Sequence, residues 1–208
     1  FSAMRALSER NDDPEHAMNA CRATLKMQKR IKELEPKWKE EYGEQIIARC
    51  GLNTGLAVAG NMGSKHKFNY TLMGDTVNLA SRFEGANKPY ATLVMIGEGT
   101  RKVVKDKVLT RELDFMAVKG KERPVRVYEL IGLMEEMTDK DKELAERFTQ
   151  ALDVYRQTKF KEAMELFQQI TEDYDGDGPS KLYIQRCRDY LRNPPPLDWD
   201  GVFRMTTK

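Results

Sequence analysis

The chain has 208 residues, which is long enough for one well-buried domain and a smaller attachment. It is 40% hydrophobic and 33% charged, a composition typical of a folded globular protein. Lysine and arginine (35) nearly balance aspartate and glutamate (33), so no overall field favours nucleic acid or an anionic membrane as a partner. The longest apolar runs, such as residues 56–59 and 93–96, are far shorter than the ~20 residues of a membrane helix.

The three cysteines, Cys21, Cys50 and Cys187, are odd in number, far apart and never in a C-x-x-C pair. This pattern argues against a disulfide framework and against a zinc site. It indicates a reduced, cytoplasmic setting. The chain starts at Phe1 with neither a methionine nor a signal peptide, so we expect further sequence upstream.

The first predicted element is a helix that follows Asp13-Pro14, with Asp13 as N-cap and Pro14 at its first position. Its apolar residues recur at helical spacing to about Glu35, and Pro36 predicts its end. Alternating residues 45–52 and the small residues 56–60 then predict a hairpin.

The middle of the chain mixes strand and helix patterns. The predicted elements are a strand at 68–73, a helix at 76–86 capped by Asp75, a strand at 93–96, a helix at 98–104, and strands at 107–115 and 125–131. This order with hairpins favours an α+β fold over a parallel doubly wound sheet.

Beyond Gly132 the composition changes to that of helices, predicted at 142–157, 160–174 and 180–192. We therefore expect two units, residues 1–132 and 133–208. The second is predicted to be a docked α-helical cap that resembles one tetratricopeptide-type helix pair, although the spacing is imperfect. The proline-rich tail from residue 193 is expected to be extended, with Trp199 as its anchor.

The stretch most suggestive of chemistry is residues 70–82, Tyr-Thr-Leu-Met-Gly-Asp-Thr-Val-Asn-Leu-Ala-Ser-Arg, which leads from a strand into a helix. On that helix Val77, Ala80 and Phe83 can face a core, while Asn78, Ser81, Arg82 and Gly85 share the opposite side. Asn78 and Arg82 are one turn apart. A guanidinium suits phosphoryl oxygens, and an amide can orient a hydroxyl beside it.

This stretch and four others in the same order resemble the class III adenylate/guanylate cyclase catalytic domain, and most of all bacterial adenylate cyclases. The others are Gly-Leu-Asn-Thr-Gly at 51–55, Gly-Asn-Met-Gly-Ser at 60–64, Val-Lys-Gly-Lys at 118–121 and Val-Tyr-Glu-Leu at 127–130. The similarity spans residues 1 to 132 and matches the C-terminal half of that domain. It implies a ferredoxin-like antiparallel sheet with packed helices, whose N-terminal part would precede Phe1.

The resemblance implies that the ribose 3′-hydroxyl of a nucleoside triphosphate attacks its own α-phosphorus and expels pyrophosphate. Arg82 matches the arginine that stabilises charge on the α-phosphate, and Asn78 the asparagine that orients the ribose. Lys119, and less specifically Lys121, matches the lysine that binds the terminal phosphates. For Lys121 an exposed charge on a turn is an equal alternative.

Substrate choice in this family is read partly at the position of Thr71, whose hydroxyl can accept from the adenine amino group. It favours ATP over GTP, with an ordinary strand residue as the alternative. The implied cofactor is Mg²⁺ or Mn²⁺, with ligands upstream of Phe1, so this fragment alone is expected to be inactive.

The resemblance also implies a homodimer with the active site between two catalytic domains, and an upstream regulatory domain. A guanylate cyclase and a non-catalytic cyclase-like module that binds nucleotide or a partner remain alternatives. An RNA-binding domain is disfavoured, because the strands lack paired exposed aromatics. The acidic run 173–178 resembles a calcium loop, but its twelfth position is Ile184 where a glutamate is required.

Overall fold

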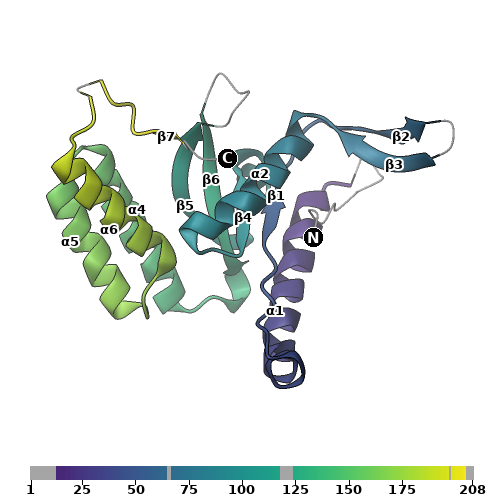
Figure 1. Ribbon diagram of the computed structural model, residues 1–208, viewed down its shortest axis with the longest axis horizontal. Helices are drawn as coiled ribbons and strands as arrows, with labels where there is room; N and C mark the ends of the chain where they lie inside the picture. Colours follow the sequence, from purple (N-terminus) through teal and green to yellow (C-terminus); the bar gives the residue numbers. More distant parts are fainter. Residues whose placement is uncertain (1–12, 65–66, 118–123, 197, 205–208) are drawn as a thin grey trace.

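The computed structural model describes residues 13–64, 67–117, 124–196 and 198–204 (Figure 1). Its centre is a five-stranded sheet in the order β1-β4-β6-β5-β7. The strands are β1 (Cys50–Leu52), β4 (Val94–Gly97), β6 (Val125–Leu133), β5 (Val108–Ala117) and β7 (Phe203–Arg204). β6 is antiparallel to both β4 and β5, whereas β1 pairs with β4, and β7 with β5, in parallel. The fold is α+β as predicted, but the sheet is mixed and not purely antiparallel.

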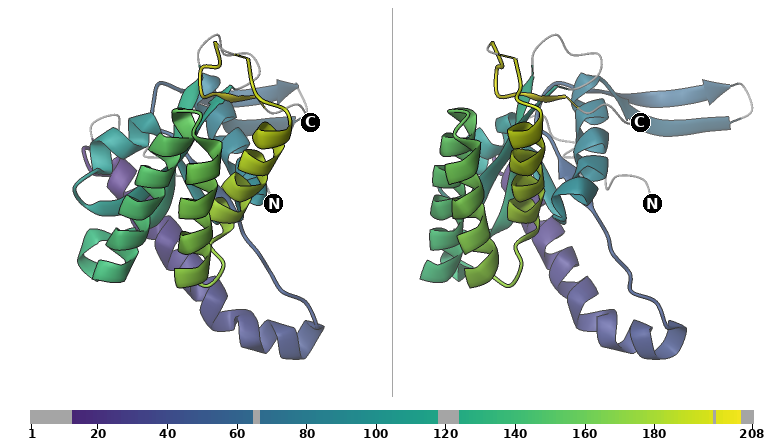
Figure 2. Two further views of the ribbon diagram at one scale, coloured as in Figure 1. Left: turned by 90° about the vertical axis from the view of Figure 1, so that its left-hand side faces the viewer. Right: turned by 60° about the vertical axis from the view of Figure 1, so that its left-hand side comes forward.

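Helices cover both faces of this sheet (Figures 1 and 2). They are α1 (His16–Tyr42), α2 (Asp75–Tyr90), α3 (Glu98–Val104), α4 (Asp139–Arg156), α5 (Phe160–Asp173) and α6 (Gly178–Arg192). Side chains alternate along a strand, so neighbours enter opposite cores. Val94 and Ile96 pack in the cluster that contains α1, whereas Met95 packs in the cluster that contains α2 and α4 to α6.

A separate two-stranded arm projects from this body (Figure 1). It consists of β2 (Val58–Ser64) and β3 (Lys67–Met73), antiparallel from the Val58 and Met73 pair outward. The predicted hairpin of 45–52 with 56–60 is therefore wrong: Cys50 pairs with Val94, and residues 58–64 belong to the arm. The alternation identified a strand, but a pattern of period two does not specify its partner.

The first helix also differs from its prediction. α1 begins at His16, after a turn in which the Asp13 carboxylate accepts from the Glu15 amide at 2.9 Å. The helix bends along its length (Figure 2) but continues through Pro36 to Tyr42. Its C-cap is Gly43, which has a left-handed φ of 69°. Proline removes one hydrogen bond and kinks a helix. The strong helix formers that follow it let the helix resume.

The remaining predicted elements are confirmed with shifts of a few residues, the largest being that of α2, which continues to Tyr90. Its predicted cap is wrong: the N-cap of α2 is Gly74, and Asp75 is the first helical residue. The tail is anchored as expected, because the Trp199 ring packs against the rings of Tyr155, Phe160 and Tyr190. All three cysteines are free and buried. Within the described residues no helix is both long and apolar enough to span a membrane. The tetratricopeptide likeness of α4 and α5 stays a prediction.

Candidate functional site

Helix α2 presents two contrasting sides. Phe83, Ala86 and Tyr90 are at most 3% exposed and face the core. Asn78 and Arg82 lie one turn apart on the opposite, exposed side. Residues at i and i+4 are neighbours on a helix surface, so both polar groups can meet one ligand. The structure thus places these two predicted residues together and open to the outside of this chain.

The segment after β1 supports the first turn of α2. The Asn53 side-chain amide donates to the Thr76 carbonyl at 3.2 Å, and the hydroxyls of Thr54 and Thr100 are 2.9 Å apart. Gly51 lies so close to the helix that a Cβ there would be 2.0 Å from the Ala80 carbonyl oxygen. The glycine-rich motif at 51–55 therefore has a structural reason: it lets β1 and its loop pack directly on α2.

Asn87 holds α2 to β1 from the buried side and was not singled out by the sequence analysis. It is fully buried, and its side-chain nitrogen donates to the Cys50 and Phe83 carbonyls, both at 2.9 Å. Its oxygen accepts from the Thr92 hydroxyl at 2.8 Å. The signal available in the sequence was an amide on the same helical side as Phe83 and Tyr90, where an apolar residue would be expected.

A cavity of about 270 Å³ lies beside the first half of α2. It is lined by Asn53, Thr54, Thr76, Leu79, Phe83, Gly97, Glu98, Gly99, Pro124, Val125 and Arg126. The lining combines apolar residues with hydroxyl, amide, carboxylate and guanidinium groups. None of these residues was predicted from the sequence to bind a ligand.

The other predicted site residues are placed differently. Thr71 is half-buried in the arm, where it pairs with Gly60, so it lies on a different element from Asn78 and Arg82. Lys119 and Lys121 lie outside the described residues. They precede Pro124 and Val125, which line the cavity, by only a few positions in the sequence.

The part of the chain that the structure describes contains no cluster of three or more histidine, cysteine, aspartate or glutamate side chains suited to a metal ion. In the acidic run, Asp177 has a structural role: it accepts from the Ser180 amide at 3.0 Å to cap α6, and it pairs with the buried Arg111 at 2.7 Å.

The model of one protein family, the adenylate and guanylate cyclase catalytic domain, matches residues 2–132. The chain belongs to this family. The match includes β1, the arm and α2, and it ends within β6. It confirms the resemblance on which the roles of Asn78 and Arg82 depend.

Named relatives and solved structures agree with this assignment. "Adenylate cyclase 1" of Rhizobium meliloti is 37% identical over 122 residues, 59% of this chain and 18% of the relative. "Adenylate cyclase, terminal-differentiation specific" of Dictyostelium discoideum is 30% identical over 189 residues, 89% of this chain and 9% of the relative. The chain thus spans less than a fifth of the length of these relatives.

Two solved structures share the fold. The adenylyl cyclase CyaB from P. aeruginosa aligns with a TM-score of 0.53 and 29% identity, over 62% of this chain and 65% of that one. The guanylyl cyclase Cya2 aligns with a TM-score of 0.52 and 26% identity, over 61% and 63%. An adenylyl and a guanylyl cyclase are therefore about equally similar in structure, and the fold does not distinguish the two substrates.

Proposed function

We propose that this chain is part of an adenylate cyclase that converts ATP to 3′,5′-cyclic AMP and pyrophosphate. The observation that carries the proposal is the pair Asn78 and Arg82, exposed on one side of α2 in a chain of the cyclase family. In the reaction the ribose 3′-hydroxyl releases its proton to solvent, and its oxygen bonds to the α-phosphorus. The bond from that phosphorus to the bridging oxygen breaks, and pyrophosphate leaves.

Each proposed residue answers one requirement of this reaction. Negative charge grows on the α-phosphoryl oxygens, and we assign its stabilisation to the Arg82 guanidinium. Asn78, one turn earlier, orients the ribose. Lys119, with Lys121 as a weaker candidate, binds the terminal phosphates, and Thr71 accepts from the adenine amino group.

The proposed metal ion depends less on the residues of this chain than the nucleotide does. Mg²⁺ or Mn²⁺, when bound to a nucleoside triphosphate, neutralises phosphate charge and polarises phosphoryl oxygens. The described residues offer no carboxylate cluster that fits such an ion. We assign the ligands to a segment preceding Phe1, and we expect this chain alone to be inactive.

The arm supports the further proposal of a homodimer. Leu56, Val58 and Met73 at its base are 95%, 69% and 47% exposed, and Tyr70 is 58% exposed. A lone two-stranded ribbon is at best marginally stable in water, and a cluster of exposed apolar side chains marks an interaction surface. A second catalytic domain seated on the arm would cover these residues and face Asn78 and Arg82. An upstream regulatory domain is part of the same proposal.

Two other functions are alternatives. The similarity to a guanylyl cyclase structure keeps GTP as an alternative substrate. The second is a non-catalytic cyclase-like module that binds nucleotide or a partner, which a product assay distinguishes from an enzyme.

The test is a product assay on the full-length protein that contains this chain. It is incubated with ATP or GTP and Mn²⁺, and cyclic products are measured by mass spectrometry. We expect cyclic AMP from ATP, with GTP turned over at least about tenfold more slowly. Predominant formation of cyclic GMP would instead identify GTP as the substrate. Nucleotide binding without any cyclic product would favour the non-catalytic module.

A further inference from the structure

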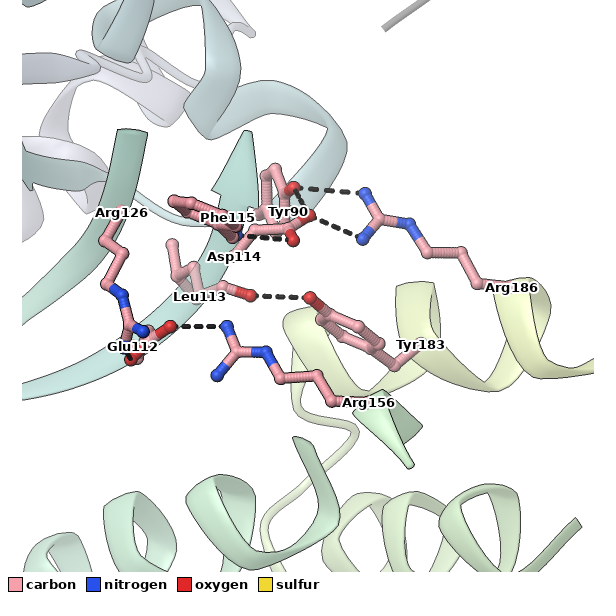
Figure 3. A network of polar contacts seen from close by, with 9 residues as sticks. All are labelled: Tyr90, Glu112, Leu113, Asp114, Phe115, Arg126, Arg156, Tyr183 and Arg186. Atoms are coloured by element: carbon pink, nitrogen blue, oxygen red, sulfur yellow. Dashed lines mark hydrogen bonds and ion pairs between the residues drawn. The ribbon is translucent and has the colours of Figure 1, made fainter. Parts of the chain in front are cut away.

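The C-terminal end of α2 is tied to α6, which lies outside the family match. Arg186 of α6 donates to the Asp114 carboxylate of β5 at 2.7 Å and to the Tyr90 hydroxyl at 3.0 Å (Figure 3). Tyr90, the last residue of α2, in turn donates a hydrogen bond from its hydroxyl to the Asp114 carboxylate. Three elements far apart in the sequence thus meet in one closed triangle of polar contacts.

The three side chains of this triangle are buried, so their positions relative to one another are closely constrained. Tyr90, Asp114 and Arg186 are 1%, 2% and 7% exposed. Burial and the nearby Asp114 raise the pKa of Tyr90 well above its ordinary value. The phenol therefore stays protonated and remains a hydrogen-bond donor to Asp114. Charge-assisted hydrogen bonds are strengthened in a low-dielectric interior, and a missing partner there is costly. Small displacements of Tyr90 are therefore opposed.

A second contact supports the same connection. Gly178, the first residue of α6, lies where a Cβ would be 2.6 Å from the Ala91 Cβ and 3.1 Å from the Tyr90 carbonyl oxygen. Ala91 is the C-cap of α2 and has a left-handed φ of 53. The start of α6 therefore packs directly on the end of α2, independently of the Arg186 side chain.

This end of α2 lies near the residues proposed for catalysis. Tyr90 follows Arg82 by eight positions, about 12 Å along a helix. Residues 78–90 lie in one helix that continues through Pro89, so a shift or rotation at Tyr90 is passed along it to Arg82 and Asn78. A displacement of ~1 Å can cost up to ~100-fold in rate when a group must meet a transition state.

We propose that Tyr90, Asp114 and Arg186 are positioning residues for the cyclase reaction, through which α4 to α6 set the placement of α2. The inference rests on the proposed function of Asn78 and Arg82. The family match ends at residue 132. The Dictyostelium match includes 189 residues and so must extend into these helices. Through these three residues, helices α4 to α6 contribute to the reaction without touching the substrate.

The test compares two variants of the full-length protein, Tyr90→Phe and Tyr183→Phe. Each removes one buried phenol hydroxyl: the Tyr90 hydroxyl bonds Asp114 and Arg186, whereas the Tyr183 hydroxyl donates to the Leu113 carbonyl at 2.7 Å and so links α6 to β5 alone (Figure 3). Both variants keep the ring and the Asp114–Arg186 pair. A similar loss of stability is expected from each, measured by urea unfolding.

We expect Tyr90→Phe to lower kcat about tenfold with KM for ATP within about twofold, because placement affects the transition state more than ground-state binding. Tyr183→Phe is expected to keep kcat within about twofold. Hydrogen exchange should quicken at residues 86–90 in Tyr90→Phe only. An unchanged kcat in Tyr90→Phe, or an equal loss in both variants, would overturn the inference alone. No cyclic product from the unsubstituted protein would overturn the proposed function together with it.

Discussion

Arg82 and Phe83 are neighbours in the chain with opposite environments. Arg82 is exposed, whereas Phe83 is 1% exposed and packs in the core that contains α2 and α4 to α6. Successive helix residues are 100° apart, so the exposed side of α2 could be inferred from the sequence. The hydrogen bonds of Asn87 could not, because its acceptor at Cys50 lies 37 positions away.

At this scale we predict the effect of replacing Arg82. In the full-length protein Arg82→Ala is expected to lower kcat by ~10²–10³-fold, since it removes a preorganised cation from the developing charge. Lys88→Ala, which removes an exposed cation from the same helix, is the matched control and should change kcat less than about twofold. Steady-state kinetics and thermal unfolding of both variants check this. An active, folded Arg82→Ala enzyme would contradict the assigned role.

Among the elements, strands and helices were predicted better than their pairing. β3, β4, β5 and β6 match predicted strands within a few residues, because their patterns are local. The partner of β1 was predicted wrongly, since β4 lies about 40 positions further along and is reached only after α2. The passage of α1 through Pro36 was also missed, because a kink and a stop share one local signal.

A charge at the base of the arm is expected to weaken dimerisation. Val58→Glu places a charge where Val58 and Met73 pair at the arm's base, and it is expected to raise the dimer dissociation constant at least about tenfold if a second copy covers that surface. Val103→Glu, at a 50% exposed position on α3, is the control. Sedimentation of the full-length protein over a range of concentrations measures both. Equal dimerisation of the two variants would exclude the arm from the interface.

For the whole molecule, the sheet joins two cores, each of which buries at least one thiol. Burial raises the pKa of Cys21, in the α1 core, from 9.0 to about 11, and that of Cys187, in the α6 core, to about 12. The folded state therefore keeps these protons at a pH where the unfolded chain has lost them. By linkage, their contribution to stability is complete below pH 9 and is lost as the pH rises toward 11 for Cys21 and toward 12 for Cys187.

The buried thiols are expected to make the protein less stable at alkaline pH. Between pH 9 and 10.5 the free energy of unfolding should fall, approaching a slope of about 1.4 kcal/mol per pH unit for each buried thiol. Urea unfolding at half-unit intervals measures the slope. A double variant, Cys21→Ala with Cys187→Ala, should show a clearly shallower slope whatever its absolute stability. An unchanged slope would contradict the assignment to these thiols.

The sequence by itself determined the family, the α+β class, most helices and strands, and the side of α2 that carries Asn78 and Arg82, because ordered motifs and local periodicity are properties of neighbouring residues. Only the tertiary structure decided that the sheet is mixed, that β2 and β3 form a projecting arm, and that α6 holds the end of α2 through Arg186. These are contacts between residues as many as 96 positions apart. Their energies depend on burial and geometry, which the folded chain sets as a whole.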